Sequence, residues 1–183
     1  WSRTLLLLGR FAEVIVLAQQ TLPLKPVEAE TMWGIALSLE GLDLRGAEEH
    51  LQKAEALCND FMPPSSLAQI QFERGSVAAQ QGDLLRAVEL YRASLATAER
   101  GSEALAQKIL ALNNLAYHLH LLHDANANGY AERGLKLAQE IGALYQQTYL
   151  FSTLGEIALA QNEVARAEKY FEEGLALAEQ LSI

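Results

Sequence analysis

Small side chains recur along this chain at intervals of 40 residues, each time one helical turn from another small side chain. The first set of positions is Ala54, Ser94, Gly134 and Gly174, and the second, four residues further on, is Cys58, Ala98, Ala138 and Ala178. Residues four apart lie on one face of an α-helix, and small side chains there let another helix approach closely. The pattern therefore predicts four equivalent helices, each packed against a neighbour.

A second pattern lies upstream of each of these helices. Gly34, Gly75, Ala116 and Gly155 are followed seven residues later by Gly41, Gly82, His123 and Asn162. We interpret the first set as the close-packing position of a first helix, and the second set as the turn that ends it. Asp43, Asp83 and Asn162 itself carry side chains that can accept from the free N–H groups opening the next helix. Each repeat is thus predicted to contain a first helix, a turn and a second helix.

The residues that carry this pattern resemble the tetratricopeptide (TPR) repeat. Gly75, Gly82-Asp83 and Ala87-x-x-x-Tyr91 follow its L-G and A-x-x-x-F signature, as do Leu154-Gly155, Asn162 and Ala167-x-x-x-Phe171. The period is about 40 residues instead of the usual 34 or so, which implies helices about one turn longer. The resemblance implies an all-α fold, a right-handed α-solenoid of antiparallel helix pairs (a TPR-like superhelix).

The repeats divide the chain into a single solenoid over residues 1–183. We expect a partial repeat at 1–24 and full repeats at about 26–61, 64–100, 102–141 and 143–182. The chain begins inside a repeat and ends without a polar capping helix, although terminal repeats normally have a polar outer face. We therefore expect it to be a fragment of a larger protein. Long repeats with phrases similar to Asn113-Asn114-Leu115-Ala116-Tyr117 resemble those of bacterial maltose-regulator-type transcription activators.

A binding groove in such a solenoid is lined by the first helices. The resemblance places its positions in three of them: Gln69, Phe72, Ser76 and Gln80, then Asn113, Tyr117, His120 and Leu121, then Tyr149, Ser152 and Glu156. Lys and Arg are missing from these positions, which disfavours a clamp for a partner's terminal carboxylate. Neutral polar and aromatic side chains suit backbone hydrogen bonds and apolar anchors.

Asn113 and Asn114 fall inside a predicted helix, where asparagine is a poor helix former. Two interpretations stay open for Asn113 and Asn114. Their amides either bond an adjacent repeat or contact a ligand, since buried polar groups must be satisfied either way.

The histidines near the third turn suggest a metal site only superficially. His118 and His120 point to different faces, which leaves His120, His123 and Asp124 without an evident fourth ligand, so we predict no metal site. The acidic pairs Glu48-Glu49 and Glu172-Glu173 are expected on solvated faces of second helices. Phosphate-binding loops, nucleophile elbows and Cys/His nucleophile pairs are missing. We predict no enzyme and no cofactor.

Composition narrows the partners and the compartment. The formal net charge of −9 among 183 residues disfavours nucleic acid as a direct partner. No apolar run reaches the roughly 18 residues of a membrane span, and the run from Leu5 to Leu8 ends at Gly9. The single cysteine, Cys58, suits a reducing compartment, so we expect a cytoplasmic protein.

The sequence thus predicts a scaffold that binds a protein or peptide, the sensor or docking region of a larger bacterial regulator acting in transcription or signalling. The alternative is a receptor domain that closes around a small metabolite or signal peptide. The apolar run at the N-terminus also predicts an end-to-end homodimer through exposed apolar surface.

Overall fold

The structure, a computed structural model, describes residues 2–41 and 43–182. All the secondary structure assigned in these ranges is helical, which confirms the all-α class. The described helices are α1 (Ser2–Leu7), α2 (Phe11–Thr21), α3 (Pro26–Glu40), α4 (Leu44–Ala56), α5 (Pro64–Gln80), α6 (Leu84–Glu99), α7 (Leu105–Leu121), α8 (Ala127–Glu140), α9 (Leu144–Ala160) and α10 (Val164–Leu181).

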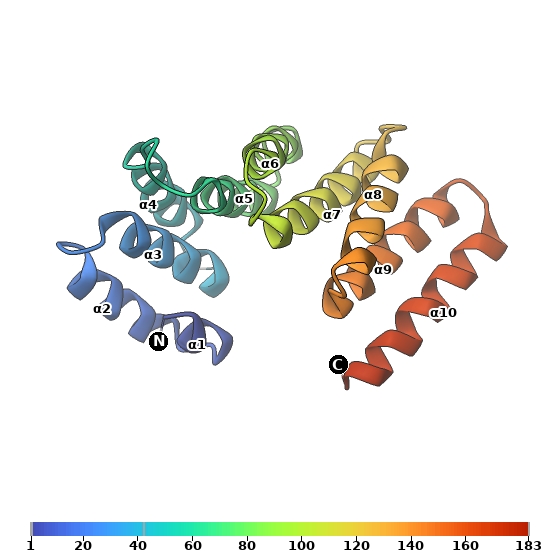
Figure 1. Cartoon of the computed structure of the whole chain (residues 1–183), viewed down its shortest axis with the longest axis horizontal. Helices are drawn as coiled ribbons and strands as arrows, with labels where there is room; N and C mark the ends of the chain where they lie inside the picture. Colours follow the sequence, from blue (N-terminus) through green and yellow to red (C-terminus); the bar gives the residue numbers. More distant parts are fainter. Residues whose placement is uncertain (1, 42, 183) are drawn as a thin grey trace. The chain divides into compact units, whose positions relative to one another are not determined.

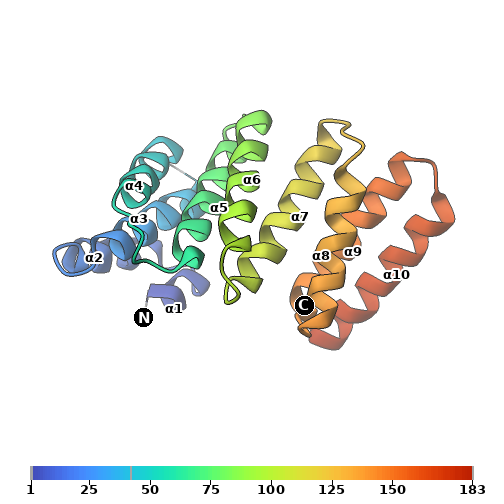
Figure 2. The ribbon, with the colours of Figure 1, turned by 45° about the horizontal axis from the view of Figure 1, so that its top comes forward.

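Consecutive helices form antiparallel pairs, which is the arrangement of a TPR-like solenoid (Figures 1 and 2). The pairs α3/α4, α5/α6, α7/α8 and α9/α10 lie within the four full repeats expected from the sequence. The chain divides into two compact units, Trp1–Thr97 and Ala98–Ile183. The expectation of one solenoid over residues 1–183 stays a prediction.

The turns between first and second helices share one backbone conformation. Gly41 and Gly82 have φ of 72° and 81°, and the non-glycine residues at the same position, His123 and Asn162, have φ of 58° and 61°. This is the left-handed region that glycine tolerates best, so all four belong to the predicted turn position. Such a residue redirects the chain so that the second helix can return along the first.

Two of the three predicted helix caps are confirmed. The Asp43 carboxylate accepts from the N–H of Gly46 at 2.8 Å, and the Asp83 carboxylate accepts from the N–H of Arg86 at 3.1 Å. The prediction for Asn162 was wrong, because Asn162 takes the left-handed turn and Glu163 precedes the first residue of α10 without a side-chain capping bond.

Glycines on the first helices leave room for large side chains of the second helices. A Cβ at Gly75 would lie 2.7 Å from the Tyr91 ring, and a Cβ at Gly34 would lie 2.6 Å from Leu51. A Cβ at Gly155 would collide with the Phe171 ring. The two ends of the TPR-like signature are thus one packing contact, glycine against aromatic ring.

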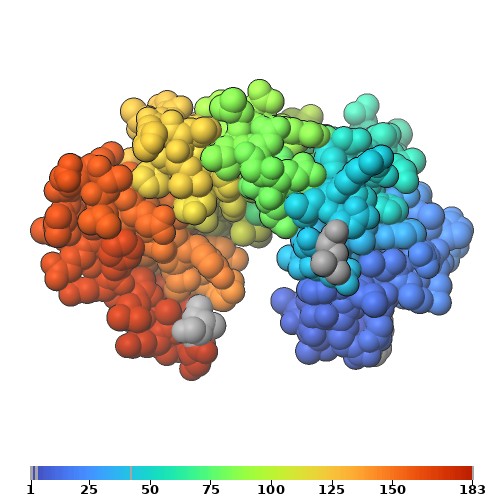
Figure 3. Space-filling view, turned by 180° about the vertical axis from the view of Figure 1, so that it is seen from behind, coloured from blue at the N-terminus to red at the C-terminus, as the bar shows by residue number. Residues whose placement is uncertain are grey.

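Apolar side chains between the helices form the core of each unit. In the first unit, Val14 packs with Met32 and Ile35, and Leu51 packs with Val77. The clusters in the second unit include Ile109, Ala138 and Leu150. Side chains fill the gaps between neighbouring ribbons (Figure 3). None of the helices in the described ranges combines the length and the apolar character that a membrane crossing requires.

Candidate binding surface on the first helices

In the first unit, two of the predicted groove residues on α5 contact Tyr91 of α6, the second helix of their own pair. Phe72 is half-buried and packs on the Tyr91 ring, with centroids 5.4 Å apart. The Tyr91 hydroxyl donates to Ser76 Oγ at 3.3 Å. Burial raises the pKa of Tyr91 to about 12, and the nearby charge of Glu73 adds to the rise.

The other two residues on α5 face the preceding repeat. Gln80 donates to the hydroxyl of Ser38 on α3 at 2.8 Å. Gln69 is half-buried and lines a pocket of about 440 Å³ between α3 and α5. The polar side chains of the pocket are Ser2, Glu28, Thr31, Ser66 and Gln69, and its apolar side chains are Val27, Met32, Met62 and Ile70.

Glu73 lies one turn beyond Gln69 on α5, and the sequence analysis did not single it out. Burial raises the pKa of the Glu73 carboxyl from its ordinary 4.5 to about 7, and a hydrogen bond with Gln69 lowers it only in part. Among the described residues, Lys, Arg and His side chains make no ion pair with Glu73. A half-buried carboxyl without a counter-ion is a feature of functional sites. A charged residue beside an expected groove position was the signal available in the sequence.

In the second unit, the predicted residues on α7 differ in exposure. Asn113 is half-buried, and its Oδ1 accepts from the Thr153 hydroxyl on α9 at 3.0 Å. Asn114 turns back to its own helix and donates to the Leu110 carbonyl at 3.0 Å. Tyr117 is 37% exposed, with its ring edge-on to His118, whereas His120 is half-buried. The bond to Thr153 is therefore a tie between repeats, the first of the two interpretations left open for Asn113.

The predicted residues on α9 are all exposed. Tyr149 is 50% exposed, and its hydroxyl lies 2.8 Å from that of Tyr145, which is equally exposed. The hydrogen bond with Tyr145 is the main cause of the raised pKa of Tyr149. Ser152 and Glu156 are also exposed.

The structure brings predicted residues of α7 and α9 together within the second unit. Tyr117 lies one turn after Asn113 on α7, and Tyr149 lies one turn before Thr153 on α9, so the Asn113–Thr153 bond lies between the two tyrosines. Phe72, a predicted groove residue on α5, belongs to the other compact unit, and its part in the same groove stays a prediction.

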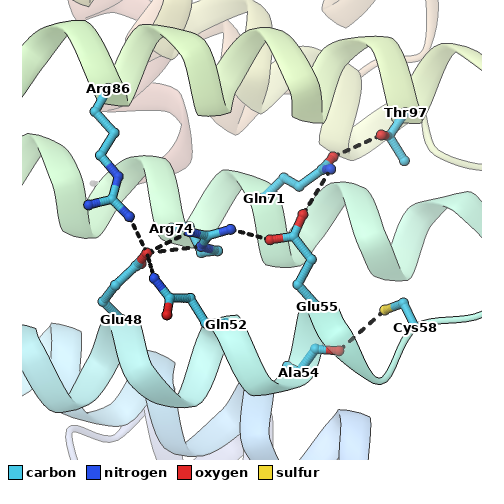
Figure 4. Close-up of polar contacts among 9 residues, drawn as sticks. All are labelled: Glu48, Gln52, Ala54, Glu55, Cys58, Gln71, Arg74, Arg86 and Thr97. Atoms are coloured by element: carbon cyan, nitrogen blue, oxygen red, sulfur yellow. Dashed lines mark hydrogen bonds and ion pairs between the residues drawn. The ribbon is translucent and has the colours of Figure 1, made fainter.

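The acidic pairs Glu48-Glu49 and Glu172-Glu173 were expected on solvated faces of second helices, and this prediction was wrong for Glu48. Glu49, Glu172 and Glu173 are exposed, whereas Glu48 is buried. Arg74 of α5 and Arg86 of α6 both bond Glu48 Oε1, at 2.6 and 2.5 Å (Figure 4). Arg74 also pairs with Glu55, so the guanidinium lies between two carboxylates of α4. The second helix α4 thus carries Glu48 inward, where the next repeat supplies two arginines.

One of the histidines near the third turn, His118, bonds the backbone of its own helix. His118 is buried, its Nδ1 lies 2.8 Å from the Asn114 carbonyl, and burial lowers its pKa. Asp124 accepts from the N–H of Asn126 at 2.8 Å. In the ranges 2–41 and 43–182, no group of three or more His, Cys, Asp or Glu side chains is placed to hold a metal ion.

Comparison with known proteins identifies the fold through solved structures. No protein-family model and no curated protein matches the chain. Crystal structures that match include BtubC (BKLC) from P. vanneervenii, with a TM-score of 0.78, 21% identity and coverage of 93% of this chain and 72% of that one. MamA matches with a TM-score of 0.70 and 17% identity, over 99% of this chain and 96% of that one.

A third match is to the nearly identical TPR-like repeats of a Podosopora anserina protein described as a kinesin light chain. The TM-score is 0.65 at 17% identity, over 99% of this chain and 92% of that one. At these identities the likeness concerns the fold. This chain has the fold of a TPR-like repeat protein.

Proposed function

We propose that the chain is a scaffold that binds an extended peptide segment of a protein partner on the exposed side chains of α7 and α9. The observation that carries this proposal is the pair of exposed tyrosines, Tyr117 and Tyr149, on either side of the Asn113–Thr153 bond. Aromatic rings supply contact area, and the half-buried Asn113 amide between them can bond a peptide backbone, whereas the buried Thr153 hydroxyl is used by its bond to Asn113. Because these side chains are neutral, binding at this strip is only weakly salt-dependent.

A peptide display screen against the purified chain tests the proposal. Tyr149→Ala should weaken binding of a selected peptide by about 1–2 kcal/mol, because a central aromatic anchor is lost. Leu175→Ala, at an apolar residue on α10 that is 61% exposed, is the matched control and should leave affinity unchanged. The proposal would be refuted if no peptide were recovered, or if the Tyr149 variant bound every recovered peptide with the same affinity as the wild type.

Two variants separate the roles of Asn113. Thr153→Val removes only the tie between repeats, whereas Asn113→Ala removes the tie and the amide together. Each should cost about 0.5–1.5 kcal/mol in free energy of unfolding, the usual net value of one hydrogen bond. Loss of peptide affinity in the Asn113 variant alone would assign ligand contact to the amide. Unchanged affinity in both variants would leave Asn113 with a structural role.

A small-ligand receptor is the second candidate, favoured by the pocket between α3 and α5. Its volume of about 440 Å³ falls in the range of small-molecule sites, roughly 300–1,000 Å³. A metabolite at about 100 times its dissociation constant would stabilise the fold by roughly 2.7 kcal/mol, which a thermal-shift screen detects. Shifts with metabolites and none with peptides would favour this candidate.

The regulatory part of the proposal rests on the resemblance to bacterial maltose-regulator-type activators. In this part of the proposal, the chain is the sensor or docking region of a larger cytoplasmic protein. The coding sequence on both sides of this segment tests it. A parent protein without a DNA-binding or nucleotide-binding region would remove the regulatory role and leave the scaffold role standing.

A further inference from the structure

The pocket between α3 and α5 presents hydrogen-bond acceptors to a ligand. The Thr31 hydroxyl donates its proton to the Val27 carbonyl at 2.7 Å, so its lone pairs are the groups left for a ligand. The hydrogen bond between Gln69 and Glu73 lowers the pKa of the carboxyl, which means that the Gln69 amide donates and its Oε1 stays an acceptor. Glu28 adds a carboxylate that is largely exposed and 3.2 Å from Lys25. A ligand that matches these groups must bring N–H donors.

The charges around the pocket favour a cation. Glu73 has no basic partner among the described residues, since the adjacent Arg74 is bonded to Glu48 and Glu55. Glu73 is not among the residues that line the pocket, but it lies one turn beyond Gln69, so a cation held at Gln69 would offset part of the cost of burying that carboxylate. The chain's net charge of −9 also attracts basic partners over longer distances.

The apolar side of the pocket suits a flexible aliphatic stem. Met32 and Met62 line it together with Val27 and Ile70. Methionine side chains adapt to the shape of what they contact, and long basic side chains bury their methylene groups against apolar surface. A stem of three or four methylenes that ends in N–H donors is the side chain of lysine or arginine.

We propose that this pocket receives a lysine or arginine side chain of a partner peptide, with the stem along Met32 and Met62 and the cationic head held by Gln69, near the Glu73 carboxylate one turn further along α5. The proposal rests on the proposed peptide-binding function and adds a basic residue to the partner. In contrast to the neutral strip on α7 and α9, binding at this pocket weakens as salt is added.

The chain offers two built-in reporters for a test. It contains two methionines, and both line the pocket, so methyl-labelled methionine gives two NMR signals that report on this site. The probe is the pentapeptide acetyl-Gly-Ser-Lys-Ser-Gly-amide at pH 8, and the comparison peptide carries norleucine in place of lysine. Both signals should shift in a saturable way with the lysine peptide and stay in place with the norleucine peptide. Equal shifts with both peptides, or none with the lysine peptide, would overturn the proposal.

Variants identify the residues responsible. Glu73→Gln should weaken binding of the lysine peptide about tenfold, because an opposite charge near the bound cation is lost. Glu172→Gln, at an exposed carboxylate of α10, removes the same net charge and should leave the affinity unchanged. Ser66→Arg puts a cation into the pocket and should abolish the shifts. Wild-type affinity in both the Glu73 variant and the Ser66 variant contradicts the assignment.

Two further results separate this proposal from the proposed function. Free lysine lacks the flanking peptide bonds and should bind at least about tenfold more weakly, and equal binding would overturn the peptide as occupant. Peptides that depend on Tyr149 and leave both methionine signals unmoved would refute the pocket while the proposed function stands. Shifts with the lysine peptide, combined with screened peptides whose affinities Tyr149→Ala leaves unchanged, would support the pocket and refute the strip on α7 and α9.

Discussion

Gly155 shows how much a single position contributes to the packing of a repeat. A Cβ there would collide with the Phe171 ring of the paired helix, and the same relation joins Gly75 to Tyr91. The aromatic ring occupies the volume that any larger residue would need. Glycine is unfavourable inside a helix, so the stabilisation that offsets this cost must come from the close packing of the ring against Gly155.

Gly155→Leu should therefore destabilise the fold by about 1–3 kcal/mol, the usual cost of overpacking. Denaturant unfolding followed by circular dichroism measures the change. Gly129→Leu is the control, since Gly129 lies in α8 and a Cβ there would have no neighbour within 4 Å. An unchanged unfolding midpoint for the Gly155 variant would contradict the packing argument.

Glu73 gives the stability a dependence on pH. Its pKa is about 7 in the folded chain and near 4.5 when solvated, so folding takes up a proton between these values. The contribution of Glu73 to stability is therefore greatest at and below about pH 4.5, falls as pH rises toward 7 and is level above that. Glu73→Gln should stabilise the fold by about 1–3 kcal/mol at pH 8, because an unpaired buried charge is removed.

The measurement is the difference in free energy of unfolding between wild type and variant at several pH values. That difference should grow from pH 5 to pH 7 and then stay constant. Glu172→Gln, at an exposed carboxylate, should show no such growth. A pH-independent difference for Glu73→Gln would mean that the carboxyl titrates normally.

At the scale of elements, a cluster of charged side chains joins three helices of the first unit. Arg74 of α5 lies between Glu48 and Glu55 of α4, and Arg86 of α6 reaches the same Glu48 oxygen. Gln71 extends the cluster, because it donates to Glu55 at 3.2 Å and accepts from Thr97 at 2.8 Å (Figure 4). Buried charges of this kind require their partners, since each is costly alone.

Arg74→Met should lower the free energy of unfolding by about 3 kcal/mol, since it leaves Glu55 without its cation and Glu48 with one of its two arginine partners. Arg133→Met, which breaks the exposed pair with Glu99, is the control and should cost less than about 1 kcal/mol. Chemical denaturation gives both values. Equal costs would show that the cluster adds no more than a surface ion pair.

At the scale of the whole molecule, the N-terminal helix leaves apolar surface uncovered. Leu7 and Leu8 are 89% and 63% exposed, whereas Leu5 and Leu6 pack against the core cluster of Val14 and Met32. Exposed apolar surface of this kind promotes association. The exposed Leu7, and not the packed Leu6, is therefore the residue at which to test a homodimer without disturbing the fold.

We expect the chain to dimerise at high concentration and Leu7→Glu to shift it toward monomer. Light scattering across a concentration series measures the mass. Leu24→Glu places the same charge on another residue of the first unit, 83% exposed, and should leave association unchanged. A strictly monomeric wild type at high concentration would refute the expectation.

The sequence by itself determined the helices, their pairing and their turns. Small residues at a fixed period and turn residues between them act locally, because helix packing positions and left-handed turns depend on neighbours a few residues away. The resemblance to the TPR repeat could therefore be read from local signatures such as the one that runs from Gly75 to Tyr91, and the structure explains the two ends of that signature as a glycine-to-ring contact.

Only the tertiary structure decided which polar side chains bond one another across repeats. Glu48 was expected in solvent and lies between arginines, Asn113 had two possible partners and bonds Thr153, and Glu73 was overlooked. The residues in each of these bonds are about 26 to 40 positions apart. Whether a charge at such a position is solvated or buried depends on how far the next repeat is rotated and shifted against it, and no local pattern encodes that geometry.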